Sequence, residues 1–331
     1  QITIARNYLQ GVGGQLLMDQ LPLRANVQVL TMENRVNGRP VYVADSANTA
    51  TSMATGEVTS RGRIATTAGS DRDLTTIMEL AEAAGYRTGI VTTASVTDAT
   101  PAAFAAHISY RLCENPTKMI DIVYGGINLG GCAADQKANG GSGSIAEQLA
   151  ESGLDLLLGG GGKHFAPLAE GETISVLELA LRQGFTLVGS RQELAGAAPD
   201  GRLLGLFSES TLPVRLRDEG DRAAEQPEPS LLNELHPYLG AVTKPEPMTC
   251  EPNPGARAVP TLQEMTELAL TRLSLANQRG FFLMIESASI DKQAHERRPC
   301  GSIGELEQLE EALASVLAFA EKHPRTLVLV T

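Results

Sequence analysis

Short, continuously apolar runs alternate along this chain with longer amphipathic segments, and this alternation limits the folds open to it. The apolar runs predict strands at 41–44, 88–93, 154–158, 185–188, 281–285 and 326–330. The amphipathic segments predict helices at 74–84, 145–151, 174–183, 262–276 and 303–322, two of which carry capping boxes, Thr261 with Glu264 and Ser302 with Glu305. Apolar strands separated by amphipathic helices are typical of a mostly parallel sheet covered on both faces. The sequence therefore predicts an α/β fold, a three-layer α/β/α sandwich with a mostly parallel central sheet.

The chain is long enough to bury one large core, because 42% of its 331 residues are hydrophobic. We expect a single domain over residues 1–331, without internal repeats. The segment 215–259 is rich in proline and acidic residues, which predicts a surface excursion within that domain. Gln1 enters an amphipathic pattern directly and Thr331 closes an apolar run, so we expect a chain truncated at both ends.

The charge pattern argues against two classes of partner. A net charge of −12 and a pI of 5.0 provide no basic surface for nucleic acid, and no Lys/Arg-rich run indicates a membrane surface. The sequence also lacks an apolar run of about 18 residues, so no transmembrane helix is predicted. An anionic substrate must therefore be attracted by a local positive centre, either a metal ion or an arginine.

The four cysteines, Cys113, Cys132, Cys250 and Cys300, lie in loop-like segments rich in glycine and proline. They form no C-x-x-C pair and have no histidine at zinc-finger spacing, which argues against a zinc ribbon. An even number of cysteines on such segments fits two disulfides and an oxidising compartment. Four free thiols are the alternative at this point.

The residues that follow each predicted strand are the candidates for a site, because open parallel sheets bind ligands beyond the carboxyl ends of their strands. Asp45 and Ser46 follow the first strand and open a helix of small residues. A serine there meets backbone N–H groups and the positive end of the helix dipole, which suits a phosphoryl group. The alternative is that either residue only caps the helix. The lack of a G-x-S-x-G motif argues against a serine–histidine hydrolase.

Two further strand ends carry potential metal ligands. Asp98 and Thr100 follow the strand at 88–93 and offer hard oxygen atoms suited to Mg²⁺, with helix capping as the alternative. Glu286 closes the strand at 281–285, where a carboxylate needs a partner or a metal. Asp291 and His295 are four residues apart and share one helix face, so they can chelate one ion. A salt-bridged loop is the alternative for these three residues.

Two other features are interpreted as structural. The glycine run at 159–162 with Lys163 resembles a phosphate loop, but its spacing is wrong and His164 stands where a serine or threonine is required. We therefore expect a turn there. The remaining histidines lack an acidic partner at ligand spacing and are interpreted as structural or surface residues, namely His107, His236 and His323.

Taken in order, these strand ends resemble those of the alkaline phosphatases of the bacterial type, over essentially the whole chain. The resemblance depends on four motifs: Asp45-Ser46-Ala47 with its helix, Asp-Ala-Thr-Pro-Ala-Ala from Asp98, Arg111 just before Cys113, and the block from Glu286 to Cys300. It implies an alkaline-phosphatase-like catalytic domain. The implied reaction is the metal-dependent hydrolysis of small phosphate monoesters through a phosphoserine, with release of inorganic phosphate.

The resemblance also implies roles for individual residues. Ser46 would attack phosphorus, and Arg111 would hold two phosphate oxygens through its planar fork. Lys292 would lie near the phosphate, and Asp45 and Asp98 would lie just behind the reacting groups. The metal ligands in this chain would be Ser46, Asp291 and His295 for Zn²⁺, and Thr100 and Glu286 for Mg²⁺. The disulfides would be Cys113–Cys132 and Cys250–Cys300.

One geometric condition follows for Arg111. A helix rises about 1.5 Å per residue, so a straight helix from Pro101 to Arg111 would leave the arginine about 15 Å from Thr100. The helix must therefore end early and the chain must turn back.

The resemblance implies two Zn²⁺ and one Mg²⁺ in a complete enzyme, and it places further zinc ligands just before Gln1 and just after Thr331. It also implies a homodimer and a periplasmic or secreted location. Ala294 stands where the family often has a polar residue, and the Cys113–Cys132 loop is longer than expected. Two alternatives are a catalytically incomplete, phosphate- or metal-binding module, and a phosphodiesterase or sulfatase relative. Arg111 and the absence of a sulfatase-type motif argue against the latter.

Overall fold

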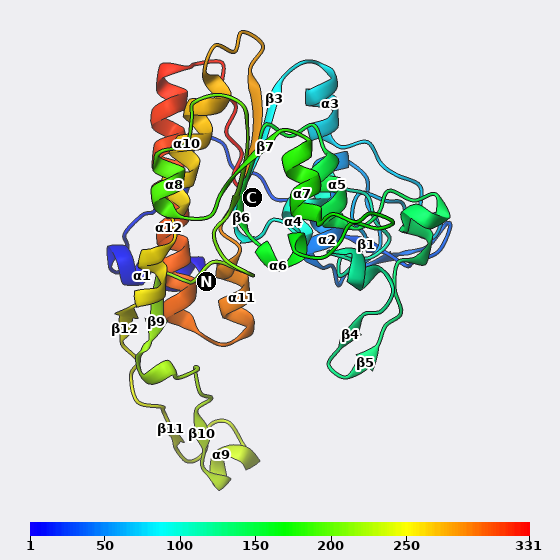
Figure 1. The fold of residues 1–331 in the computed structure, drawn as a ribbon. Helices are drawn as coiled ribbons and strands as arrows, with labels where there is room; N and C mark the ends of the chain where they lie inside the picture. Colours follow the sequence, from blue (N-terminus) through cyan, green and yellow to red (C-terminus); the bar gives the residue numbers. More distant parts are fainter.

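One parallel five-stranded sheet forms the centre of the computed structural model, which describes residues 1–331 apart from the side chain of Tyr124. The strand order is β13–β3–β6–β8–β7, and every neighbouring pair is parallel. The strands are β3 (Arg87–Ser95), β6 (Leu156–Gly160), β7 (Phe185–Val188), β8 (Arg202–Leu206) and β13 (Phe281–Glu286). Figure 1 shows this sheet between two layers of helices. The predicted α/β sandwich is confirmed.

Helices cover both faces of the sheet (Figure 1). One layer contains α3 (Ile77–Ala83), α4 (Ala99–Ala105), α5 (Ile145–Glu151) and α7 (Val176–Arg182). The other layer contains α8 (Arg191–Ala195), α10 (Leu262–Ser274) and α12 (Pro299–Lys322), with α1 (Ile2–Gln10) packed on the far side of α12. Within the described residues, no helix has the length and apolar content needed to cross a membrane.

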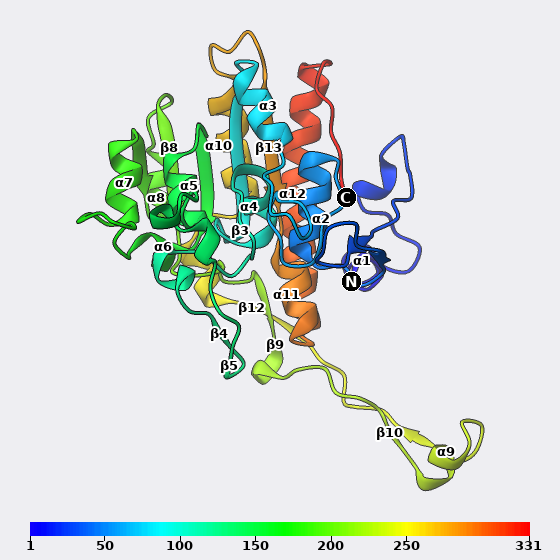
Figure 2. The same ribbon diagram turned by 90° about the vertical axis from the view of Figure 1, so that its right-hand side faces the viewer.

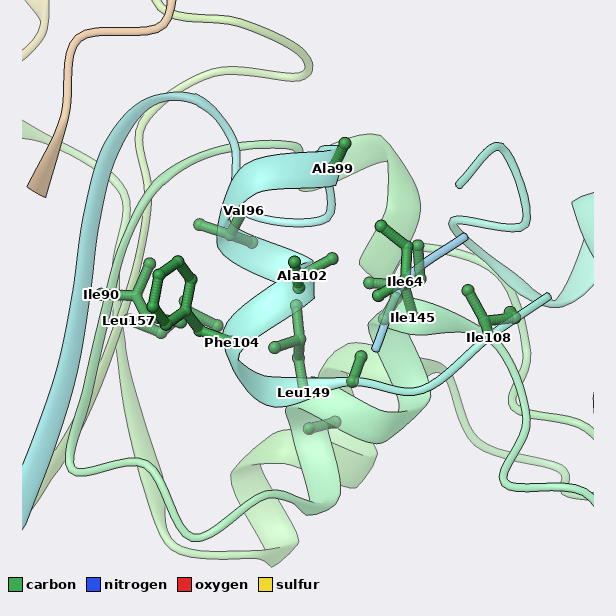
Figure 3. Packing of buried hydrophobic residues seen from close by; sticks show 14 of the residues in the cluster. Ile64, Ile90, Val96, Ala99, Ala102, Phe104, Ile108, Ile145, Leu149 and Leu157 are labelled. Atoms are coloured by element: carbon green, nitrogen blue, oxygen red, sulfur yellow. The ribbon is translucent and has the colours of Figure 1, made fainter. Parts of the chain in front are cut away.

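Successive side chains of the central strands point to opposite faces of the sheet, and they therefore divide the core into two clusters. On β3, Ile90 packs into the cluster under α4 and α5, whereas Val91 packs into the cluster under α10. Figure 3 shows Phe104 of α4 beside Ile90 and Leu157 in the first cluster. Because each fully buried side chain of this size contributes about 1.5–3 kcal/mol, burial on both faces holds the central strands firmly.

Four of the six predicted strands are confirmed, and two predictions are wrong. Within the first, only Pro40–Val41 forms a strand, β2, and it pairs with β1 (Thr31–Met32) outside the central sheet. The run at 326–330 is extended but forms no strand, and Leu327 and Leu329 are 80% and 78% exposed. The reason is that a strand also needs a hydrogen-bonded neighbour, and none lies beside 326–330 in the described part of the chain.

Strand β8 was not predicted, although it lies between β6 and β7. Its short sequence, Arg-Leu-Leu-Gly-Leu, contains a glycine, which weakens a strand pattern. The glycine is required by packing, since a Cβ on Gly205 would come within 2.6 Å of the Phe207 ring. The glycine thus marks a close approach and not a break in the strand.

The predicted helices all form, although their ends differ. The helix at 145–151 has the predicted bounds, and the Thr261–Glu264 capping box is confirmed. The box at Ser302 is wrong because α12 begins three residues earlier, at Pro299, a residue favoured in the first helical turn. The hydroxyl of Ser302 instead donates to the Ile290 carbonyl at 2.8 Å.

The segment 215–259 forms an arm that extends from the α12 side of the sheet (Figures 1 and 2). At its base, β9 (Leu216–Asp218) pairs with β12 (Cys250–Pro252). Further out, β10 (Glu228–Pro229) pairs with β11 (Val242–Thr243) around α9 (Leu231–Leu235). The Cys250–Cys300 disulfide, as predicted, joins the base of the arm to the start of α12.

His107 is structural, and its acidic partner comes from a different element. Its Nε2 lies 2.9 Å from a carboxylate oxygen of Glu79, which also closes the capping box of α3 with Thr76. Burial alone would lower the pKa of His107, but hydrogen bonds to Glu79 and to the Ala65 carbonyl raise it overall. The same contact helps to lower the pKa of Glu79 against the opposing effect of burial.

This pair predicts a pH-dependent contribution to stability. The raised pKa of His107 stabilises the fold below the unfolded value of 6.5, and the lowered pKa of Glu79 stabilises it above 4.5. We expect E79Q, which keeps the cap, to destabilise the chain more at pH 5.5 than at pH 8.5, by less than about 1 kcal/mol. Urea unfolding at both pH values would measure this. E178Q, at the corresponding position of the α7 box, should show no such pH dependence.

Candidate functional site

Helix α2 (Ser46–Thr55) places Ser46 at its exposed N-terminus. The cap of the helix is Asp45, whose side chain accepts from the Asn48 N–H at 3.1 Å while the Asn48 side chain accepts from the Asp45 N–H at 2.8 Å. Capping therefore belongs to Asp45 and leaves the Ser46 hydroxyl free of that role. A second acceptor bond, from the Gly62 N–H at 3.1 Å, fixes the Asp45 carboxylate further.

Arg111 reaches the same place because α4 ends at Ala105. The chain then turns back, Ile108 bridges to Ile64, and the Arg111 N–H donates to the Gly62 carbonyl at 2.7 Å. The geometric condition deduced from the sequence is met. One guanidinium nitrogen of Arg111 lies 2.8 Å from Asp98, and another lies 3.4 Å from Asp45.

Asp98 joins two cations at the N-terminus of α4. Its Oδ1 accepts from Arg111, and its Oδ2 lies 2.5 Å from the Lys292 ammonium. Burial would raise the pKa of Asp98, but Lys292 and Arg111 lower it overall. A carboxylate between two cations keeps both side chains in place while leaving part of their charge uncompensated, which suits an anionic substrate.

Glu286 ends β13 beside β3, and its Oε2 accepts a hydrogen bond from Thr92 at 2.6 Å. Burial and the nearby Asp98 raise the pKa of Glu286, although hydrogen bonds from Thr92 and Thr100 oppose the rise. Among the described side chains, no cation lies within ion-pair distance of this carboxylate. A partly buried carboxylate next to a threonine hydroxyl is a donor set that suits a hard divalent cation.

Asp291 and His295 lie on α11 (Ser289–His295), 3.4 Å apart between His295 Nε2 and Asp291 Oδ2. Both side chains are exposed, at 67% and 80% respectively. They therefore form a two-ligand pair open to solvent. No group of three or more His, Cys, Asp or Glu side chains among the described residues is arranged to hold a metal ion.

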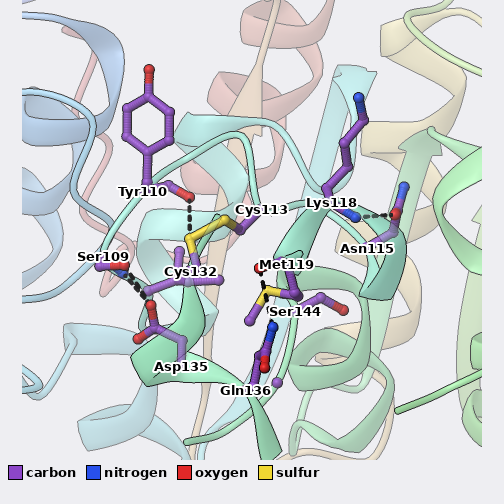
Figure 4. The surroundings of a disulfide bond; sticks show 12 residues. Ser109, Tyr110, Cys113, Asn115, Lys118, Met119, Cys132, Asp135, Gln136 and Ser144 are labelled. Atoms are coloured by element: carbon purple, nitrogen blue, oxygen red, sulfur yellow. Dashed lines mark hydrogen bonds between the residues drawn. A yellow bond between two sulfur atoms is a disulfide. The ribbon is translucent and has the colours of Figure 1, made fainter. Parts of the chain in front are cut away.

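The Cys113–Cys132 disulfide begins two residues after Arg111, and Figure 4 shows it beside Tyr110. Cys113 is buried, and its carbonyl accepts from the Ile145 N–H at 3.1 Å, at the start of α5. The other cysteine follows the β4 (Val123–Tyr124) and β5 (Ile127–Asn128) hairpin. Both disulfides join the cysteines that the resemblance implied.

Sequence reasoning missed a polar pair beside Asp98. Glu114 accepts a hydrogen bond from Thr97 at 3.0 Å, and His164 Nε2 lies 3.4 Å from the same carboxylate oxygen. Burial and Asp98 raise the pKa of Glu114 to about 7, while burial and Lys163 lower the pKa of His164 to about 4. Fifty positions separate the two residues, so no motif spacing could reveal them.

The turn predicted for the glycine run is confined to Gly161, because Gly159 and Gly160 end β6 and Gly162 begins α6. A Cβ on Gly160 would meet the Ser210 carbonyl at 1.7 Å, and one on Gly161 would meet the Ser95 hydroxyl at 2.1 Å. The turn leads into α6 (Gly162–Phe165) and packs the end of β6 against the end of β3. This close approach brings His164 next to Glu114.

Comparisons with known proteins match this chain to one family. The family model of alkaline phosphatase matches residues 1–331. Over its full length, the chain is 42% identical to the streptomycin-6-phosphate phosphatase of Streptomyces griseus and 40% identical to the alkaline phosphatase of Escherichia coli. It spans 69% and 66% of those two proteins, about two thirds of their length. The crystal structure of Thermus thermophilus alkaline phosphatase matches 98% of this chain and 54% of its own, with a TM-score of 0.64 at 24% identity.

Proposed function

Because this chain belongs to the alkaline phosphatase family, we propose that its site hydrolyses phosphate monoesters through Ser46. The observation that carries the proposal is the position of Arg111. Its guanidinium lies 3.4 Å from Asp45, the residue next to Ser46, at the N-terminus of α2. A phosphate group held there meets a planar fork of N–H donors and the serine hydroxyl together.

The proposed reaction has two displacements at phosphorus. In the first, the Ser46 hydroxyl loses its proton as its oxygen bonds to phosphorus, the bond to the leaving alcohol breaks, and the alcohol takes up a proton. In the second, water loses a proton as it attacks the phosphoserine, the Ser46–phosphorus bond breaks, Ser46 regains a proton, and inorganic phosphate is released. Arg111 holds two equatorial oxygens of the phosphoryl group in both steps, because charge accumulates there in the transition state.

Metal ions would supply what these side chains lack, since Zn²⁺ acidifies a bound hydroxyl or water. The described residues fit partial metal sites. Glu286 and Thr100 offer oxygen atoms for Mg²⁺, and the raised pKa of Glu286 indicates a carboxylate that a cation would stabilise. Asp291 and His295, together with Ser46, are the proposed zinc ligands of this chain. Lys292, held by Asp98, would add positive charge near the phosphate.

The direct test is hydrolysis of p-nitrophenyl phosphate by the purified chain with Zn²⁺ and Mg²⁺. Because its own residues supply only part of the zinc ligands, we expect turnover to be very low and inorganic phosphate still to bind. Binding without turnover would identify this chain as a phosphate-binding module whose catalysis requires further ligands. Absence of both in metal-loaded protein would contradict the proposal.

Arg111 provides a prediction about affinity. We expect R111K to weaken the binding of inorganic phosphate about tenfold, because a lysine keeps the charge but loses the paired N–H donors. Isothermal titration calorimetry of metal-loaded protein would measure the change. R217K is the matched control, since Arg217 forms an exposed pair with Glu251 on the arm. Equal affinities of R111K and the wild type would contradict the assigned role.

Two broader proposals accompany the reaction. The two disulfides favour an oxidising compartment, so we place the protein in the periplasm or outside the cell. We also propose a homodimer, as the resemblance implies. Light scattering after size-exclusion chromatography would test it, and a monomer at all concentrations tested would contradict it.

A further inference from the structure

We propose that Glu114 is a positioning residue that keeps the Asp98 segment in register with Arg111 while Arg111 holds a phosphate. The proposal rests on the proposed function, because it assumes that Arg111 binds the substrate. It concerns two short segments, residues 95–98 before α4 and residues 111–115 after it. Two contacts join these segments side by side: Asp98 to Arg111 at 2.8 Å, and Thr97 to Glu114 at 3.0 Å.

The two contacts differ in what a substrate would do to them. A phosphate that binds Arg111 competes with Asp98 for the guanidinium, so the first contact loosens when the site is occupied. The second contact lies behind the first, and the Thr97 side chain is completely buried. Glu114 can therefore hold the two segments together when Arg111 turns to its ligand.

Glu114 also contacts His164, and the neighbours of this histidine fix its tautomer. Asn115 Oδ1 accepts from the Thr117 N–H, the Thr117 hydroxyl and the Lys118 N–H, so its amide nitrogen must face His164 Nδ1, 2.9 Å away. An amide nitrogen only donates, which leaves Nδ1 as the acceptor and places the hydrogen of neutral His164 on Nε2. His164 Nε2 lies 3.4 Å from the same Glu114 oxygen that accepts from Thr97.

Asn115 thus donates to His164, and the protonated ring nitrogen of His164 contacts Glu114. From the other side, Ser95 contacts Thr97 at 2.8 Å, and Thr97 donates to Glu114. Because the one hydroxyl hydrogen of Thr97 points to Glu114, Ser95 must be the donor to Thr97. The Glu114 carboxylate is the acceptor on which the Ser95–Thr97 chain ends. Removing it leaves the buried Thr97 hydroxyl without its acceptor.

The test uses two substitutions of Glu114 that separate the effect of its negative charge from the effect of its hydrogen bond to Thr97. Glu114→Gln keeps an oxygen acceptor for Thr97 and removes the negative charge, whereas Glu114→Ala removes both. We expect E114A to bind inorganic phosphate about tenfold more weakly than E114Q, measured by calorimetry on the whole chain with Zn²⁺ and Mg²⁺. T97V should weaken binding similarly, and the E114A/T97V double variant should be no weaker than E114A alone.

The control is a carboxylate with the same local chemistry at the opposite end of β3. Glu82 accepts from the Thr88 hydroxyl at 2.8 Å, and burial raises its pKa, as for Glu114. E82A should lower the urea midpoint but leave phosphate affinity unchanged.

Three results would overturn the inference. Equal phosphate affinity of E114A and E114Q would show that the hydrogen-bond acceptor at residue 114 does not position the site. Weakening by E82A as large as that by E114A would show a general loss of stability, and additive effects of E114A and T97V would show that Glu114 does not act through Thr97. If the wild-type chain binds no phosphate, the proposed function fails and this inference fails with it.

Discussion

Replacement of Ser46 by alanine is expected to abolish the covalent phosphorylation of this protein. The Ser46 hydroxyl is the proposed nucleophile, exposed at the start of α2, and Asp45 already provides the cap, so the substitution should leave the helix intact. Loss of the covalent nucleophile lowers turnover on the order of 10⁶-fold in a serine protease. Any turnover that the metal-loaded protein shows on p-nitrophenyl phosphate should fall to background in S46A.

The matched control for Ser46 is Ser52, on the same helix. Its hydroxyl donates to the Asn48 carbonyl at 3.0 Å, so S52A tests the loss of a helical serine without touching the proposed nucleophile. Mass spectrometry of acid-quenched protein should detect a phosphoryl group on the wild type and S52A and none on S46A. Phosphorylation of S46A at an unchanged level would eliminate Ser46 as the nucleophile.

Removal of the Cys250–Cys300 disulfide is expected to destabilise the chain by about 4 kcal/mol. This disulfide closes a loop of 50 residues, and the loss of chain entropy in the unfolded state grows with loop length. By the same relation, the 19-residue separation of Cys113 and Cys132 predicts about 3 kcal/mol. Urea unfolding of the C250A/C300A and C113A/C132A variants would measure both values.

The two disulfides should differ more in their effect on the site than in stability. Cys113 lies two residues from Arg111, whereas Cys250 and Cys300 join the arm to α12. C113A/C132A should therefore weaken phosphate binding at temperatures where it is still folded, and C250A/C300A should not. A C250A/C300A variant as stable as the wild type would contradict the loop-closure estimate.

The sequence predicted the buried strands well because apolar composition on both faces is a local signal. It failed at 41–44 and 326–330, where the apolar run is real but pairing depends on a neighbour that composition does not reveal. It missed β8 because the glycine that its packing demands reads as a break in the strand. Local sequence signals therefore identified the strands more reliably than the neighbours with which those strands pair.

The candidate site likewise contains residues that local sequence signals reveal and residues that depend on distant parts of the chain. Asp98 and Glu286 could be predicted because they lie at the ends of buried strands, and Ser46 because it follows the apolar run at 41–44, although that run forms a strand only as far as Val41. The return of Arg111 could be stated only as a condition, since it depends on where α4 ends. The Glu114–His164 contact could not be predicted at all, because it arises from the tight Gly160–Gly161 turn.

The strand order has a consequence for how this site can grow. Six-residue β13 forms the border of the sheet, and no strand of the described chain pairs with its outer side. Its backbone N–H and C=O groups on that side form a template for β-augmentation. A segment that adds there in parallel would end beside Glu286 and bring its own side chains to the edge of the sheet that holds the candidate site. The architecture can thus recruit additional ligands by lateral extension, without repacking the strands already in place.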